Sequence, residues 1–177
     1  MNISLAQLSA FGWEVFRQAG LSQADAATAT DALLAADSWG IHTHGLKNLS
    51  GYVKRLKAGG INPLGQAWVA AEGPAWARVD GDASLGMIGS TFAMRQAIRK
   101  AEASGIGFAG LRNSCHFGAA GCYATLAADE GMIGIAMCND TPTVTVPGAR
   151  GPVLGSNPIA YAVPAGEQLV LLDIATS

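Results

Sequence analysis

Apolar residues near the start of the chain recur at helical spacing. In the first predicted helix they are Leu5, Leu8, Phe11, Trp13 and Phe16. This spacing is typical of an amphipathic helix. Ser4 followed by Gln7 has the spacing of a capping box, and Gly20 suits the end of the helix.

Two further helices are expected before residue 66. Ser22 and Asp25 open the second, which runs toward Gly40. A short polar turn follows, and the third helix covers residues 46–56 before the glycines and Pro63 end it. The sequence therefore predicts a helical N-terminal domain over residues 1–66.

The pattern changes at Ala67, where short apolar runs begin to alternate with helical stretches. Helices are expected over 89–104 and 118–130, and strands over 68–70, 77–79, 106–111, 131–138, 159–163 and 169–174. Alternating strands and helices favour a mixed α/β layer, and apolar runs suggest a sheet covered by helices on both faces. We predict an α/β protein in which residues 67–177 form this second domain.

Composition narrows the function classes. Half of the 177 residues are apolar and 14% are charged, so a buried core is expected and disorder is excluded. Eleven basic residues against 13 acidic ones, with 7% aromatics, give little support for nucleic-acid binding. The start of the chain does not resemble a signal peptide, and the apolar runs are far shorter than the roughly 18 residues of a membrane span. The three cysteines form no disulfide framework. We expect a cytoplasmic protein with no membrane segment.

All three histidines lie in two glycine-flanked turns, at residues 40–45 and 114–118. Each turn is expected to lead into a helix, whose N-terminus attracts anions. Since histidine titrates near neutral pH, these turns are candidate sites of proton transfer. A structural alternative stays open for each histidine, namely capping a helix or pairing with a backbone carbonyl.

Three other interpretations of these turns stay open. His42, His44 and His116 could bind zinc, although His42 and His44 would point opposite ways in an extended segment. Cys115 beside His116 could act as a nucleophile, although adjacent side chains rarely face each other. Residues 118–121 resemble a nucleotide-binding loop but fit neither the Rossmann nor the Walker pattern. We expect no metal.

Residues 139–164 combine five prolines with several glycines between apolar strands, which indicates a long, shaped loop. Its polar groups able to meet a ligand are Asp140, Ser156 and Asn157. Hydrogen bonding of these side chains to the loop's own backbone is an equally good explanation of their presence.

Five motifs in order along the chain resemble those of the malate/L-lactate dehydrogenase-like family. They are Gly40-Ile41-His42-Thr43-His44-Gly45 with Tyr52, the run 113–121 around His116, and the segments 131–134, 154–158 and 172–177. This family includes ureidoglycolate, sulfolactate and piperideine-2-carboxylate members and is unrelated to the Rossmann-type lactate and malate dehydrogenases.

The resemblance implies hydride transfer between NAD or NADP and a small 2-hydroxy/2-oxo acid, or a related imine, in a homodimer with a non-Rossmann fold. It assigns His116 as the acid/base, Thr43 and His44 as a hydroxyl–histidine pair at the substrate, and Tyr52 to the substrate pocket. It implies cofactor contacts for Phe117, Gly118, Ala119, Ala120, Asp140, Asp173, Ile174 and Ala175.

Two departures from the family accompany the resemblance. The resemblance assigns Asn48 to substrate binding, at a position where members commonly carry an arginine that can bind a carboxylate with two hydrogen bonds. Asparagine cannot supply that positive charge. Family chains are about twice as long, so we expect an incomplete N-terminal portion with little or no activity by itself. The alternative function is a non-catalytic subunit or dimerisation module that has lost the chemistry.

Overall fold

The computed structural model describes residues 3–177, which form two compact units, one up to residue 119 and one over 120–177. The helices of the first unit are α1 (Leu5–Gln18), α2 (Gln23–Ser38), α3 (Leu49–Lys57) and α4 (Gly86–Ser104). Its strands are β1 (Trp68–Glu72), β2 (Trp76–Asp80) and β3 (Phe108–Arg112). The second unit contains α5 (Gly121–Asp129), β4 (Gly134–Met137), β5 (Ile159–Ala165) and β6 (Gln168–Ile174).

Helices α1, α2 and α3 build the main core of the first unit. The predicted capping box is confirmed, because the Ser4 hydroxyl accepts the N–H of Gln7 while the Gln7 side chain accepts the N–H of Ser4. Phe16 of α1, Leu33 of α2 and Tyr52 of α3 are buried in one cluster. Of the apolar residues that recur along α1, Phe16 is buried whereas Phe11 is exposed, so only part of the apolar pattern faces the core.

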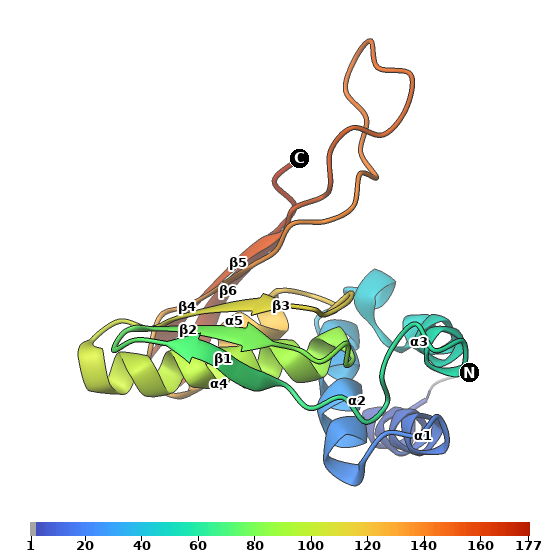
Figure 1. The fold of residues 1–177 in the computed structure, drawn as a ribbon, viewed down its shortest axis with the longest axis horizontal. Coiled ribbons are helices and arrows are strands. Elements are labelled where there is room, and N and C mark those ends of the chain that lie inside the picture. The colour runs from blue at the N-terminus through green and yellow to red at the C-terminus, as the bar shows by residue number, and fades with distance from the viewer. Residues whose placement is uncertain (1–2) are drawn as a thin grey trace. The chain divides into compact units, whose positions relative to one another are not determined.

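The first sheet has the order β1-β2-β3, with β1 and β2 antiparallel and β2 and β3 parallel. Helix α4 forms the crossover between the two parallel strands and packs along this sheet (Figure 1). It ends at Gly105, whose positive φ of 78° provides the left-handed C-cap. The segment after β3 carries residues 113–118 back toward the helical core, where Cys115 packs against the buried cluster.

The second unit is an antiparallel sheet of order β4-β5-β6 with α5 packed on it. Alanines at positions 136, 160 and 162 are buried, whereas Ile135 and Tyr161, which alternate with buried positions, are exposed, as is Leu172. Residues 138–158 form a long loop between β4 and β5 that extends away from the sheet (Figure 1). Within this loop, Val144 and Leu154 form an isolated antiparallel bridge. The loop corresponds to the shaped loop predicted over residues 139–164, except that residues 159–164 belong to β5.

The α/β class is confirmed, with one physical difference from the sequence prediction. The strands divide into two three-stranded sheets rather than one, and the second exposes alternate apolar residues on one face instead of having helices on both. The boundary at residue 66 stays a prediction about domains, and it lies within the first compact unit. No helix in residues 3–177 has both the length and the apolar character that crossing a membrane requires.

Candidate active site

The first histidine turn is held by a carboxylate from the end of α2. Residues His42–His44 and Leu46–Asn48 each form one turn of 3-10 helix. Asp37 accepts the backbone N–H of Leu46 at 2.8 Å and pairs with Nδ1 of His42 at 3.0 Å. Its side chain is only 14% exposed. A Cβ at residue 45 would collide with this carboxylate, so Gly45 permits the close approach that fixes the turn.

The second histidine turn meets α3 through a short hydrogen bond. The hydroxyl of Tyr52 lies 2.6 Å from Nδ1 of His116, and the N–H of Gly118 reaches the same nitrogen at 3.4 Å. Tyr52 is only 4% exposed. Burial, followed by the nearby Cys115, raises the pKa of Tyr52 well above its usual range, and Arg55 opposes this effect. The phenol therefore stays protonated at neutral pH and can serve as donor or acceptor to His116.

The two turns converge although they are 72 positions apart in sequence. The ring of His44 stacks on that of His116 with centroids 5.9 Å apart and an interplanar angle of 21°. The hydroxyl of Thr43 lies 2.9 Å from Nδ1 of His44. The structure thus brings together the hydroxyl–histidine pair and the proposed acid/base in one cluster.

A cavity of about 250 Å³ opens beside this cluster, a size that fits a small organic acid. It is lined by Thr43, Asn48, Gly51, Tyr52, Arg55 and His116. Four of the five residues expected at the substrate therefore line one cavity, and the fifth, His44, stacks on His116. His116 is an exposed residue of the turn and does not lie deep in packing.

Asn48 does not present its amide as a substitute for an arginine. Its Nδ2 donates to the backbone carbonyl of Thr43 at 2.7 Å, so this side chain braces the turn. The cation that lines the cavity is Arg55 instead. Sequence reasoning overlooked Arg55, Gly51 and Asp37. The signal for Arg55 was its spacing of three and four residues from Tyr52 and Gly51 on the same helix.

The geometry gives little support to a nucleophilic Cys115 or to a zinc site formed by the three histidines. The Cys115 thiol donates toward the carbonyls of Ser84 and His116, and burial raises its pKa, which disfavours the thiolate. His42 pairs with Asp37. Within residues 3–177, no group of three His, Cys, Asp or Glu side chains is arranged to hold a metal ion.

The residues expected at the cofactor belong to both compact units. Phe117, Gly118 and Ala119 belong to the first unit, and Ala120, Asp140 and the run 173–175 belong to the second. Asp140 accepts the Ser156 hydroxyl at 2.9 Å and the N–H of Thr141, and these bonds, Ser156 first, lower its pKa. Asp173 accepts the N–H of Gly121 at 2.7 Å, at the positive end of α5. Their roles toward a cofactor stay predictions.

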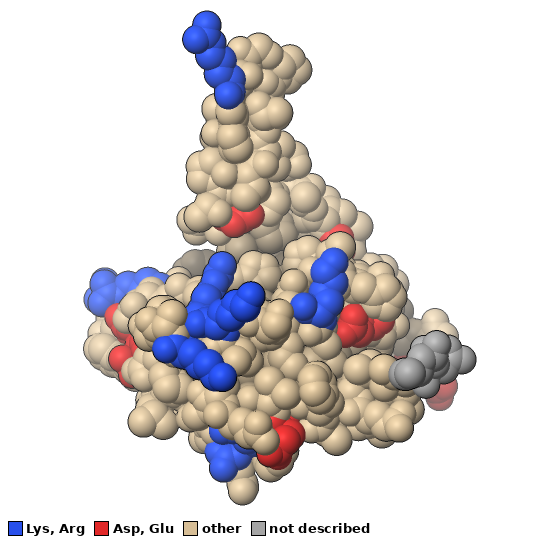
Figure 2. Space-filling view, turned by 90° about the vertical axis from the view of Figure 1, so that its right-hand side faces the viewer, with Lys and Arg blue, Asp and Glu red and all other residues tan. Residues whose placement is uncertain are grey.

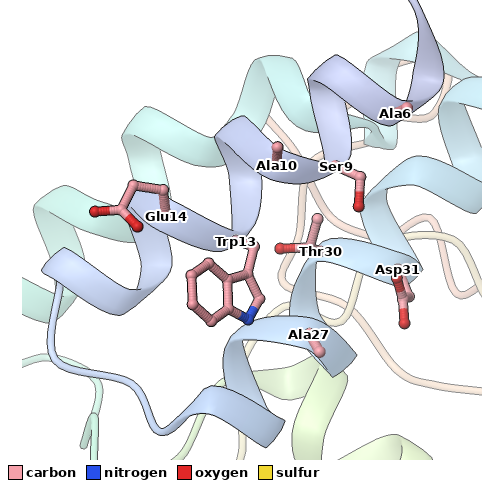
Figure 3. Close-up of a pocket in the computed structure, with 8 residues that line it drawn as sticks. All are labelled: Ala6, Ser9, Ala10, Trp13, Glu14, Ala27, Thr30 and Asp31. Atoms are coloured by element: carbon pink, nitrogen blue, oxygen red, sulfur yellow. The ribbon is translucent and has the colours of Figure 1, made fainter.

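A second, larger cavity of about 540 Å³ lies between α1 and α2 (Figure 3). It is lined largely by small side chains, with Trp13, Glu14 and Asp31 around them. The side chains of Glu14 and Asp31 point away from each other (Figure 3). Because neither a basic side chain nor a histidine lines this cavity, it offers no cation for an acid and no group that titrates near neutrality.

Comparison with known proteins shows the family to which the chain belongs. The family model described as malate/L-lactate dehydrogenase matches residues 3–177, and the chain belongs to that family. The malate dehydrogenase of Pyrococcus abyssi is 43% identical over 177 residues, which are 100% of this chain and 49% of that protein. The ureidoglycolate dehydrogenase (NAD(+)) of Escherichia coli K12 is 34% identical over 161 residues, 90% of this chain and 46% of that protein.

Solved structures show the same fold. The malate dehydrogenase of Pyrococcus horikoshii OT3 superimposes with a TM-score of 0.96 at 41% identity, covering 100% of this chain and 51% of that one. The chain therefore spans about half the length of the relatives it matches. The non-Rossmann α/β fold and the family, both expected from the motifs, are confirmed.

Proposed function

We propose that this chain supplies the substrate-binding and proton-transfer part of a nicotinamide-dependent dehydrogenase of small 2-hydroxy acids. Two relatives are named for malate and ureidoglycolate, which share a carboxylate next to a hydroxyl-bearing carbon. The observation that carries the proposal is the 2.6 Å contact between Tyr52 and His116 at the edge of a cavity sized for such an acid.

In the direction of reduction, protonated His116 gives a proton from Nε2 to the carbonyl oxygen of the 2-oxo acid. Tyr52 holds Nδ1, which fixes the orientation of the ring, and we assign the proton transfer to Nε2. In the charged ring Nδ1–H donates to the Tyr52 oxygen, and the neutral ring that remains keeps this hydrogen. In both forms Nδ1 carries a hydrogen, so the longer contact from the Gly118 N–H is not a hydrogen bond during the reaction. In the direction of oxidation, the same Nε2 accepts the proton of the hydroxyl group.

Thr43 and His44 complete the substrate side of the site. The Thr43 hydroxyl and His44 ring form a bonded pair next to His116, and Thr43 lines the cavity. We assign this pair to hydrogen bonds with the substrate's oxygen atoms. Asp37, through Leu46 and His42, keeps the turn that carries the pair in place.

A nicotinamide cofactor supplies or accepts the hydride when bound. The chemistry of the second unit fits such a group, because Asp140, held ionised by Ser156, offers an acceptor for ribose or carboxamide donors. Phe117 and the small residues 118–120 would form the part of the site nearest His116. The choice between NAD and NADP is open in this proposal, although one relative is named for NAD(+).

Turnover tests the proposal in two forms of the protein. The first is the 177-residue chain, and the second is a chimera in which this chain replaces the matching half of the Pyrococcus horikoshii enzyme. Each is assayed for NADH and NADPH oxidation with a panel of 2-oxo acids. We expect the chimera to turn over and His116→Ala to lower kcat by about 10²–10⁴-fold, as loss of a general acid does.

The control is Glu102→Ala, because Glu102 is exposed on α4 and lines neither cavity. It should retain most of the activity, and circular dichroism should show both variants folded. A folded His116→Ala chimera with the activity of the parent would overturn the assignment. A folded chimera that reduces no 2-oxo acid would favour the non-catalytic alternative.

We also propose that the protein is a homodimer and works in the cytoplasm. The exposed apolar positions of the second sheet support association, since large apolar patches commonly mark interfaces. Light scattering coupled to size-exclusion chromatography measures the mass in solution, and a monomer at micromolar concentration would contradict the dimer.

A further inference from the structure

Among the residues that line the cavity, one side chain carries a permanent positive charge. Asn48 is neutral and donates its amide to the Thr43 carbonyl. Arg55 lines the same cavity from the last turn of α3, and no carboxylate lines it. Among the ion pairs of residues 3–177, none involves Arg55. A guanidinium in this situation is available to an anionic ligand.

The spacing on α3 explains how Arg55 reaches the cavity. Residues 48, 51, 52 and 55 lie three or four positions apart and share one helix face. Between Asn48 and Arg55, Gly51 contributes no side chain, and a Cβ there would meet no atom within 4 Å. Glycine inside a helix disfavours the helix relative to alanine. Its presence here leaves open space beside Tyr52.

The charge of Arg55 acts on the groups around it. Burial raises the pKa of the Tyr52 hydroxyl and of the Cys115 thiol, and in both cases Arg55 acts to lower it. Lys54 and Lys57 join Arg55 in the last turn of α3. Figure 2, which faces the side where α3 lies in Figure 1, shows several basic side chains close together. A locally positive surface raises the concentration of anions near the cavity.

We infer that Arg55 binds the carboxylate of the substrate, across the space that Gly51 leaves open, in place of an anchor at residue 48. A guanidinium can grip a carboxylate with two parallel hydrogen bonds. The acid would then lie with its carboxylate toward Arg55 and its oxo group toward His116. This inference deepens the proposed function and rests on it for the identity of the ligand as a 2-oxo acid.

Binding measured without turnover tests the inference. Pyruvate and its uncharged methyl ester are titrated separately into the 15N-labelled chain, with and without NAD+. The amide of Gly51 and the Nε–H of Arg55 report the cavity by their chemical shifts. We expect both signals to move with pyruvate, and the ester to bind at least tenfold more weakly.

Substitutions separate charge from space. Arg55→Gln should weaken pyruvate binding at least tenfold and leave the weak binding of the ester unchanged, and Arg55→Lys should fall between Arg55→Gln and the parent. Lys54→Gln removes an equal charge from the neighbouring position, which does not line the cavity, and should change the affinity less than twofold. Gly51→Leu should weaken both ligands because it fills the space.

The outcomes are distinct from those of the proposed function. Equal pyruvate affinity in Arg55→Gln and the parent would overturn the role of Arg55, as would no shift with pyruvate in the parent with or without NAD+. The 177-residue chain could bind pyruvate through Arg55 while the chimera reduces no 2-oxo acid. That pair of results would support the carboxylate site and overturn the dehydrogenase assignment.

Discussion

The Tyr52 hydroxyl and Nδ1 of His116 lie 2.6 Å apart, although the two residues are separated by 64 positions in sequence. One residue belongs to a helix of the core and the other to an exposed turn. This bond ties the proposed proton donor to the buried core of the first unit. It gives the imidazole a fixed orientation before any ligand enters.

Tyr52→Phe should therefore impair turnover without unfolding the protein. It deletes the hydroxyl and keeps the ring that packs on Phe16, where the centroids are 6.5 Å apart. Losing a hydrogen bond to a charged group costs about 1.5–3 kcal/mol, so we expect kcat to fall roughly 10–100-fold. Measuring kcat of the parent and variant chimeras as a function of pH tests this expected decrease. Since the pKa of Tyr52 is raised, ionisation of the parent's phenol should not reduce activity between pH 7 and about 10.

Asp37→Ala should loosen the first histidine turn. The N–H of Leu46 would lose its acceptor, and His42 would lose its partner. An unsatisfied buried donor costs about 1–3 kcal/mol, which urea unfolding should detect. Gly45→Ala should have a similar effect, because its Cβ would collide with the Asp37 carboxylate. Asp31→Ala, an exposed change on the same helix, is the control and should be near neutral.

Asp80 should make stability depend on pH in the acid range. Its carboxylate accepts from Asn113 at 2.9 Å, from the N–H of Asp82 at 3.0 Å and from Arg112 at 3.1 Å. These bonds, that of Asn113 first, hold its pKa below the usual 3.8. Because the folded pKa lies below the unfolded one, the stabilisation is present above 3.8 and is lost as the pH falls through the folded value.

Asp80→Asn should accordingly be less stable than the parent at pH 7, and the difference should shrink as the pH falls below about 3.8. Urea unfolding across this range, followed by circular dichroism, measures the difference. Glu102→Gln, at an exposed position of α4, should show no comparable change. A difference between Asp80→Asn and the parent that is independent of pH would contradict this account.

Gly134→Ala should destabilise the second unit. A Cβ at this position of β4 would collide with the carbonyl of Ala124 in α5, and backbone cannot move aside as a side chain can. Overpacking of this kind costs about 1–3 kcal/mol. Gly151→Ala is the matched control, since a Cβ there meets nothing within 4 Å. Hydrogen exchange of β4 and α5 amides measures the local effect, and equal exchange in both variants would be inconsistent with such tight packing.

Cys115 should be a poor nucleophile despite its place beside His116. Burial raises its pKa, so its thiolate fraction at pH 7 lies below that of a free cysteine. In a variant that keeps Cys115 but carries serine at positions 122 and 138, we expect slow reaction with a disulfide reagent, accelerating only as the pH rises above the usual thiol range. Cys115→Ser should keep its turnover in the chimera. Loss of turnover in a folded Cys115→Ser variant would instead support a role of Cys115 as a nucleophile.

Local patterns predicted most elements of this protein. The Ser4–Gln7 capping box and the positive-φ Gly105 act over a few residues, so their spacing is visible in the sequence. The two histidine turns and the proline-containing loop were likewise marked by glycine and proline. The helix expected from residue 118 begins at Gly121, because residues 118–120 belong to the turn that carries His116.

The sequence by itself determined the α/β class, the family motifs and which turns carry the histidines, because these depend on periodicity and on residue identity over short ranges. Only the tertiary structure decided that Tyr52 binds His116, that Asn48 braces a turn, and that Arg55 supplies the positive charge of the cavity. It also decided that the strands divide into two sheets. The reason is physical: these contacts join segments far apart along the chain, and packing of the core sets their distances.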